Sequence, residues 1–102
     1  MYAMISFTFL GSDDHNYESH KIGQATSLEA TIEHIKSEVL EFFGDRRYVE
    51  IYYSDNNQTT MDVTEILRAI KVKEMTEVEY NAVKKFFGDY VGHYPQEFMA
   101  FA

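Results

Sequence analysis

Three capping boxes mark where helices begin in this chain of 102 residues, and they leave short segments between them for strands. A capping box places a Ser, Thr or Asp three residues before a Glu, so that each side chain bonds to the backbone at the other position. The boxes are Thr26 with Glu29, Asp62 with Glu65, and Thr76 with Glu79. Apolar residues at helical spacing follow each box, and Gly44 and Gly88 are expected to end the first and third helices.

Strand patterns lie between and before these helices. Residues 3–9 carry apolar side chains at every odd position, which predicts a half-buried strand. The run 48–53 is rich in β-branched and aromatic residues and predicts another strand, with residues 59–61 returning beside it as a hairpin. The polar segment 11–20 is expected to be a loop, and residues 21–25 a short strand.

These patterns together predict the α+β class. We expect one compact domain over residues 1–102 without a linker, built from an antiparallel sheet of three to four strands with about three helices packed on one face. Apolar residues make up 45% of the chain, and sixteen residues are Phe or Tyr, which is too much apolar material for a disordered chain. No segment has the apolar length of a transmembrane helix, and there is no secretory signal pattern.

The charge of the chain limits the kinds of partner that we expect, and its cysteine content indicates a compartment. Seventeen acids face nine bases, and residues 1–70 hold twelve of the acids but only five of the bases. A surface of this sign repels nucleic acid and anionic lipid and speeds encounter with basic proteins, so we expect neither direct nucleic-acid binding nor membrane binding. The chain has no cysteine, which fits a reducing compartment, and we expect a cytoplasmic protein.

Catalytic motifs are missing from the sequence. There is no cysteine nucleophile, no glycine-rich phosphate loop and no serine in a nucleophile-elbow context. Single carboxylates and the four histidines are too unspecific to identify a general base. The expectation is therefore a protein that is not an enzyme and that needs no cofactor.

The predicted helix that begins near Thr26 carries the first candidate binding surface. Glu29, Glu33, Ser37 and Glu41 follow one another at steps of four residues. Carboxylates at adjacent steps would lie about 6 Å apart, close to the spacing of phosphates along a nucleic-acid strand. Such a face could occupy a groove built for phosphate, although an ordinary solvated helix face gives the same pattern. The candidate residues are Glu29, Glu33, Glu41 and the nearby Asp45.

The acidic segment before this helix is the second candidate. Asp13, Asp14 and Glu18 surround Tyr17, which could anchor a protein contact. The same segment contains His15 and His20, but the spacing matches neither a zinc signature nor a calcium loop, so a plain acidic loop is favoured over a metal site. Tyr52, on a predicted strand, is a further candidate contact, because tyrosines among acids suit a partner rich in Arg and Lys.

A repeated heptapeptide and an apolar tail complete the sequence features. Residues 39–45 read VLEFFGD and residues 83–89 read VKKFFGD. Two helices with similar glycine-capped ends explain this echo better than a duplication does, because the capping boxes lie at different distances before the glycines. Residues 98–101 are apolar enough to need a docking place.

Three functions stay open at this level. The first is an inhibitor that binds the basic, nucleic-acid-binding surface of a nucleic-acid-processing protein. In composition alone the chain resembles immunity proteins against nuclease toxins and phage or plasmid proteins that disarm restriction or CRISPR systems. The second is an accessory or scaffold subunit that assembles through the apolar C-terminal tail, and the third is a small enzyme or metal protein.

Overall fold

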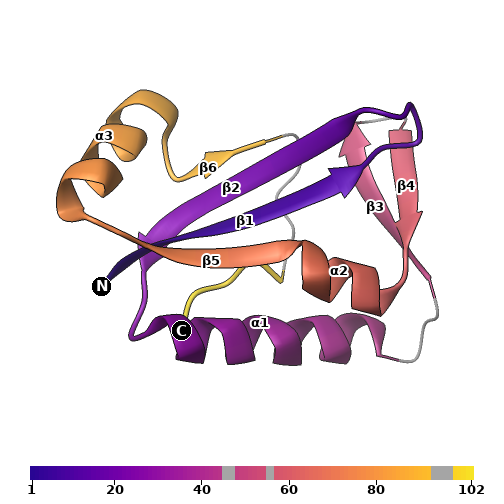
Figure 1. Ribbon diagram of the computed structural model, residues 1–102, viewed down its shortest axis with the longest axis horizontal. Coiled ribbons are helices and arrows are strands. Elements are labelled where there is room, and N and C mark those ends of the chain that lie inside the picture. The colour runs from indigo at the N-terminus through magenta and orange to yellow at the C-terminus, as the bar shows by residue number, and fades with distance from the viewer. Residues whose placement is uncertain (45–47, 55–56, 93–97) are drawn as a thin grey trace.

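The computed structural model describes residues 1–44, 48–54, 57–92 and 98–102, with the backbone alone at 52–54. Three helices and six strands follow one another within these described ranges (Figure 1). The strands are β1 (Tyr2–Leu10), β2 (Asn16–Gln24), β3 (Val49–Ser54), β4 (Asn57–Met61), β5 (Ile70–Met75) and β6 (Tyr90–Val91). The helices are α1 (Leu28–Phe43), α2 (Val63–Ala69) and α3 (Glu77–Phe87). The α+β class is confirmed.

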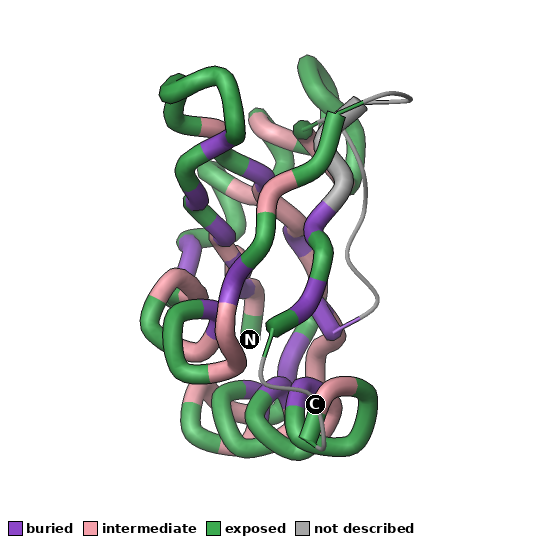
Figure 2. Tube along the Cα trace, turned by 90° about the vertical axis from the view of Figure 1, so that its right-hand side faces the viewer, coloured by how far each residue is buried: buried purple, intermediate pink, exposed green. Residues whose placement is uncertain are grey.

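The main sheet is antiparallel and has the order β5-β1-β2-β6. β1 lies between β2 and β5, so that Ile5 is paired with Lys21 on one side and with Val72 on the other. The odd residues of β1 face the core, as their alternation predicted, and Ile5 and Phe7 are fully buried. Figure 2 shows this alternation as buried segments separated by more exposed ones along the strands.

The core lies between this face of the sheet, the two-stranded sheet β3-β4, and helices α1 and α2. α1 contributes Ile35 and Val39, and α2 contributes Ile66. The C-terminal residues complete the core, because Phe98 packs edge-on against Phe7 and Phe43. Phe98 and Met99 are 1% and 0% exposed, which locates the docking place that the apolar tail required.

Hydrogen bonds tie the chain end to the start of α1. The backbone N–H of Thr26 donates to the carbonyl of Ala102 at 2.6 Å, and the Thr31 hydroxyl donates to the same carbonyl at 3.3 Å. The ring of Phe101 lies against Gly23 of β2, so closely that a Cβ at Gly23 would lie 2.7 Å from that ring. A glycine at this position therefore allows the tail to pass directly over the strand.

α3 lies on the other face of the main sheet from α1 and α2. Its Tyr80 ring lies 4.3 Å from the ring of Tyr2, an even-numbered residue of β1. Val83 and Phe87 of α3 line a groove together with Met4 of the same face. The helices are thus divided between the two faces rather than gathered on one, because β5, which the sequence pattern did not reveal, carries the chain across to the second face.

Two local predictions were wrong. The N-cap of α1 is Ser27, whose side chain accepts from the N–H of Ala30, and not Thr26. The expected loop at 11–20 is a short turn followed by β2, which begins at Asn16. Its polar residues form a strand because they pair along the whole of β1, and tertiary pairing overrides weak local propensity. The capping boxes of α2 and α3 are confirmed.

Candidate partner-binding surface

The outer side of α1 carries the acidic row that its sequence predicted. Thr31, Ile35 and Val39 fix the orientation of the helix by packing into the core. The opposite side then faces outward, and Figure 2 shows it exposed along the bottom of the molecule. Three carboxylates at multiples of four residues are exposed on this side: Glu29, Glu33 and Glu41.

Two of these three carboxylates are not neutralised within the described part of the chain. Lys36 Nζ lies 3.7 Å from Glu33 Oε1, and both side chains are exposed, so this pair contributes little to stability. Glu29 and Glu41 form no ion pair with any described residue. Along α1, only Glu33 of the row is held by a lysine, and the row keeps most of its negative charge.

Apolar side chains lie at the C-terminal end of the same helix. Leu40 is 54% exposed and Phe42 is 46% exposed, whereas Phe43 packs against Phe98 in the core. Tyr48, which follows α1 in the chain, is also exposed. Protein interfaces commonly combine a few exposed apolar side chains with a charged rim, and Leu40 beside Glu41 fits that composition.

The turn between β1 and β2 forms a second acidic group. The hydroxyl of Tyr17 donates a short hydrogen bond to Asp13 Oδ2, and His15 Nδ1 lies 3.5 Å from the same oxygen. The Tyr17 hydrogen bond is the main cause that lowers the pKa of Asp13 below 3.8. Asp14 is exposed and has a φ of 64°, a conformation that Asp tolerates at turns.

Tyr17 and Glu18 are less available to a partner than the sequence suggested. The ring of Tyr17 is half-buried and stacks on Phe9, with 5.8 Å between ring centroids, so it belongs largely to the edge of the core. Glu18 accepts a hydrogen bond of 3.3 Å from the Thr8 hydroxyl, and its other carboxylate oxygen lies 3.7 Å from His20 Nε2. Asp14 therefore remains the most open acid of this group.

The two acidic groups do not form one surface. In Figure 1 the turn between β1 and β2 is at the upper right, whereas α1 runs along the bottom, with β4 and α2 between them. Asp45 and the side chain of Tyr52 lie outside the described residues. Of the nine predicted contact residues, the structure brings Glu29, Glu33 and Glu41 together on α1 and places the turn residues elsewhere.

A serine and a histidine meet on the face of the sheet that α3 partly covers. Ser6 Oγ lies 3.0 Å from His20 Nδ1, with Glu18 beyond the histidine. The pair resembles part of a hydrolase triad, but Ser6 lies in the middle of β1 and is paired on both sides. Its backbone environment offers no free N–H groups for an oxyanion, so we interpret the contact as a cross-strand hydrogen bond.

The described residues give no geometric support to a metal site. Within them, no group of three or more His, Asp or Glu side chains is placed to hold a metal ion. Asp13 pairs with His15 at the turn, while Glu18 pairs with His20 on a sheet face, so these four side chains separate into two pairs. No helix in the described ranges is long and apolar enough to cross a membrane.

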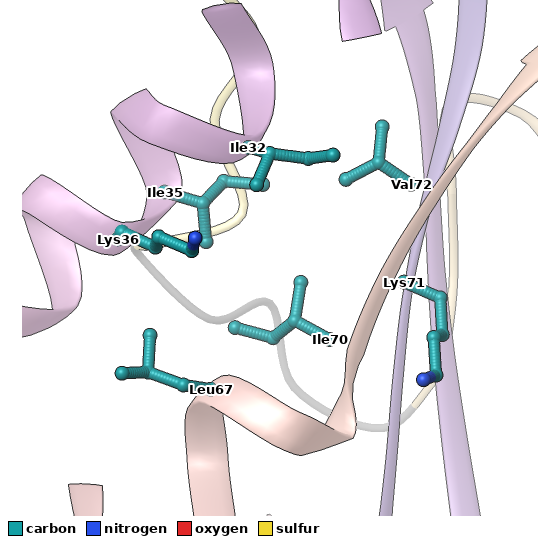
Figure 3. A pocket seen from close by; sticks show the side chains of 7 residues that line it. All are labelled: Ile32, Ile35, Lys36, Leu67, Ile70, Lys71 and Val72. Carbon is teal, nitrogen blue, oxygen red and sulfur yellow. The ribbon is translucent and has the colours of Figure 1, made fainter. Parts of the chain in front are cut away.

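A groove between α1, α2 and β5 adds an apolar recess beside the acidic row. Ile32 and Ile35 of α1 line one side of it, and Leu67, Ile70 and Val72 line the other (Figure 3). The side chains of Lys36 and Lys71 also line it. Its volume of about 240 Å³ is below that of sites for drug-sized ligands, so it suits a side chain of a protein partner better than a cofactor. Sequence periodicity missed this groove because β5 was not predicted.

Comparison with protein-family models, with curated proteins and with solved structures found no match for this chain. The geometry and chemistry of the surface are therefore the basis of the functional proposal.

Proposed function

We propose that the protein is a non-enzymatic inhibitor that binds the basic, nucleic-acid-binding surface of another protein through the outer side of α1. The observation that supports this most directly is the exposed acidic row, in which Glu29 and Glu41 have no ion-pair partner among the described residues. The row extends over three helical turns, about 18 Å at a rise of 1.5 Å per residue. Leu40 and the adjoining groove add apolar contacts at its side.

The physical basis is competition for cationic side chains. A basic surface that binds nucleic acid presents Arg and Lys at the spacing of phosphates. Glu29 and Glu33 lie about 6 Å apart along α1, with Glu41 about 12 Å further on, and these carboxylates can pair with the same groups. Long-range attraction speeds the encounter, and it weakens as salt screens the charges. Blocking such a surface requires no catalysis, so the chain needs only a rigid helix in a fixed orientation.

The biological setting that suits this activity is conflict between genetic elements. An immunity protein that blocks a nuclease toxin and a phage or plasmid protein that blocks a restriction or CRISPR complex would both act in this manner. The proposal therefore identifies the partner by its chemistry, as a basic nucleic-acid-processing protein.

Capture from lysate of the native cell tests the proposal. We expect the protein to retain a nucleic-acid-binding partner at low salt, and we expect added DNA or RNA to displace it, because both ligands use the same cationic surface. The double variant Glu29→Gln/Glu33→Gln should lose at least about tenfold in affinity, since each charge-assisted contact is worth roughly 1.5–3 kcal/mol.

The matched control is Glu50→Gln/Glu74→Gln, which changes the net charge equally at exposed positions on β3 and β5. It should bind almost as well as the original chain. Equal losses in both double variants would mean that only net charge matters. A partner that nucleic acid does not displace, or whose affinity is the same at low and high salt, would rule out the proposed mechanism.

An accessory or scaffold subunit is the second candidate, although the described part of its expected interface is occupied. Phe98 and Met99 are buried in the core, so they are not available for assembly. Large apolar side chains on α3 favour assembly through a different surface, because Val78, Phe86 and Phe87 are 79%, 73% and 65% exposed.

A further inference from the structure

We infer that α3 is a self-association surface on which a second copy of this chain packs antiparallel to the first. α3 differs from the other helices because none of its residues is buried, although four large apolar or aromatic residues lie in its last eight positions. One side of it faces the sheet through Tyr80 and Val83. The outer side has nothing packed against it among the described residues (Figure 1).

The outer side of α3 has the composition of a helix-packing surface. Val78, Ala82 and Phe86 are all exposed and lie at positions i, i+4 and i+8, so they form one apolar stripe. The small Ala82 at the centre lets a neighbouring helix approach closely, with Val78 and Phe86 at the two ends. In an antiparallel pair centred on Ala82, Phe86 of each copy would meet Val78 of the other.

The charges of α3 favour that antiparallel arrangement. Glu77 is in its first turn and Lys84 and Lys85 are in its last turn. Glu77 and Lys85 flank the stripe on the same side of the helix at 3.6 residues per turn. A two-fold axis at Ala82 would therefore place Glu77 of one copy beside Lys85 of the other, twice. A parallel pair would place like charges together, and antiparallel helix dipoles also attract.

The distribution of charge also explains why two copies of an acidic protein would meet through α3. Residues 77–87 carry two acids and two bases, whereas residues 1–70 carry twelve acids against five bases. Two copies that approach through α3 meet across a locally neutral surface. In Figure 1, α3 is at the upper left and α1 runs along the bottom, so the acidic rows of both copies would remain free. The inference does not depend on the proposed inhibitor function.

One helix of eleven residues gives a small interface, which belongs to the weak class of protein contacts. We expect a monomer–dimer equilibrium in sedimentation experiments between about 5 and 500 µM protein. Higher salt should change the dimer little, because it screens both the net repulsion between copies and the two Glu77–Lys85 contacts. The proposed partner complex should weaken markedly with salt, so failure of one proposal can be told from failure of the other.

Substitutions test the geometry. Phe86→Asp should weaken self-association at least tenfold. Leu40→Asp, which makes the same kind of change at an exposed apolar residue of α1, should leave it unchanged. Glu77→Lys and Lys85→Glu should each weaken the dimer, and the double variant Glu77→Lys/Lys85→Glu should restore it, because the exchange recreates both ion pairs. Circular dichroism and thermal unfolding would show that every variant is folded.

Two results would overturn the inference. A chain that stays monomeric up to 500 µM would show that something other than a second copy covers the stripe. A dimer that tolerates Phe86→Asp, or that the double charge exchange fails to restore, would place the contact elsewhere or in another orientation.

Discussion

At the scale of single residues, the turn between β1 and β2 shows how one hydrogen bond sets local electrostatics. Asp13 has both Tyr17 and His15 as hydrogen-bond partners, and its lowered pKa follows mainly from the tyrosine. A carboxylate with a lowered pKa contributes stability above its unfolded value, and that contribution is lost as the pH falls through the folded pKa. The loss of this stability is therefore confined to the acidic range below about pH 4.

Tyr17→Phe tests this assignment. We expect the pKa of Asp13 to rise toward 3.8, because the variant keeps the stacking on Phe9 but loses the hydroxyl donor. A carboxyl-detected NMR titration measures it directly, with Asp14 as the internal reference. An unchanged pKa at Asp13 would mean that His15 and the backbone dominate instead.

At the scale of elements, the start of α1 shows that a correct motif can be shifted by one position. Thr26 and Ser27 are both good N-cap residues, and the Glu at position 29 favoured Thr26. In the fold, the backbone N–H of Thr26 donates to the carbonyl of Ala102 and not to the Glu29 side chain, as a capping box would require, and Ser27 caps the helix. The contact with the chain end, which is distant in sequence, decides between the two.

Two alanine variants distinguish the candidates. Ser27→Ala should lower the free energy of unfolding by about 1 kcal/mol, the usual cost of losing an N-cap. Thr26→Ala should change it by less than about 0.5 kcal/mol, since its side chain is exposed. Urea denaturation measures both, and the reverse order would restore Thr26 as the cap.

At the scale of the whole molecule, the C-terminal residues close the domain. Phe98 joins β1 and α1 by edge-on contacts with Phe7 and Phe43, and Met99 accepts a hydrogen bond of 2.7 Å from Lys21 Nζ through its carbonyl. The tail is therefore part of the core that makes α1 rigid. Since α1 carries the acidic row, the candidate surface depends on a contact made by the last residues of the chain.

Phe98→Ala should cost about 3–5 kcal/mol, the range for a large aromatic removed from a core. Domains of this size are commonly stable by only about 5–15 kcal/mol, so we expect a marked drop in the melting temperature. Phe86→Ala, which removes an exposed ring, should cost less than about 1 kcal/mol and serves as the control. Similar losses in the two variants would contradict the described docking of the tail.

Local sequence determined the elements whose signals are local. The alternation of residues 3–9 located β1, the glycines after the aromatic pairs located the ends of α1 and α3, and the spacing of Glu29, Glu33 and Glu41 defined the acidic row. These signals depend on side-chain period and capping, which neighbouring residues decide. The first part of β2 and all of β5 escaped prediction, whereas residues 21–24 lie in the strand that was expected at 21–25. The polar residues of β2 form a strand by pairing with β1, and β5, in which Ile70 and Val72 alternate with Lys71 and Lys73, pairs with the other edge of β1.

The repeated aromatic pair shows what only the tertiary structure decided. Phe43, in VLEFFGD, packs in the core, whereas both phenylalanines of VKKFFGD are exposed on α3. The two segments have nearly the same local chemistry, but α1 lies over the closed core face while α3 lies over the partly polar opposite face of the sheet. Burial is a property of what the fold brings against a side chain, and for these identical residues no local pattern contains that information.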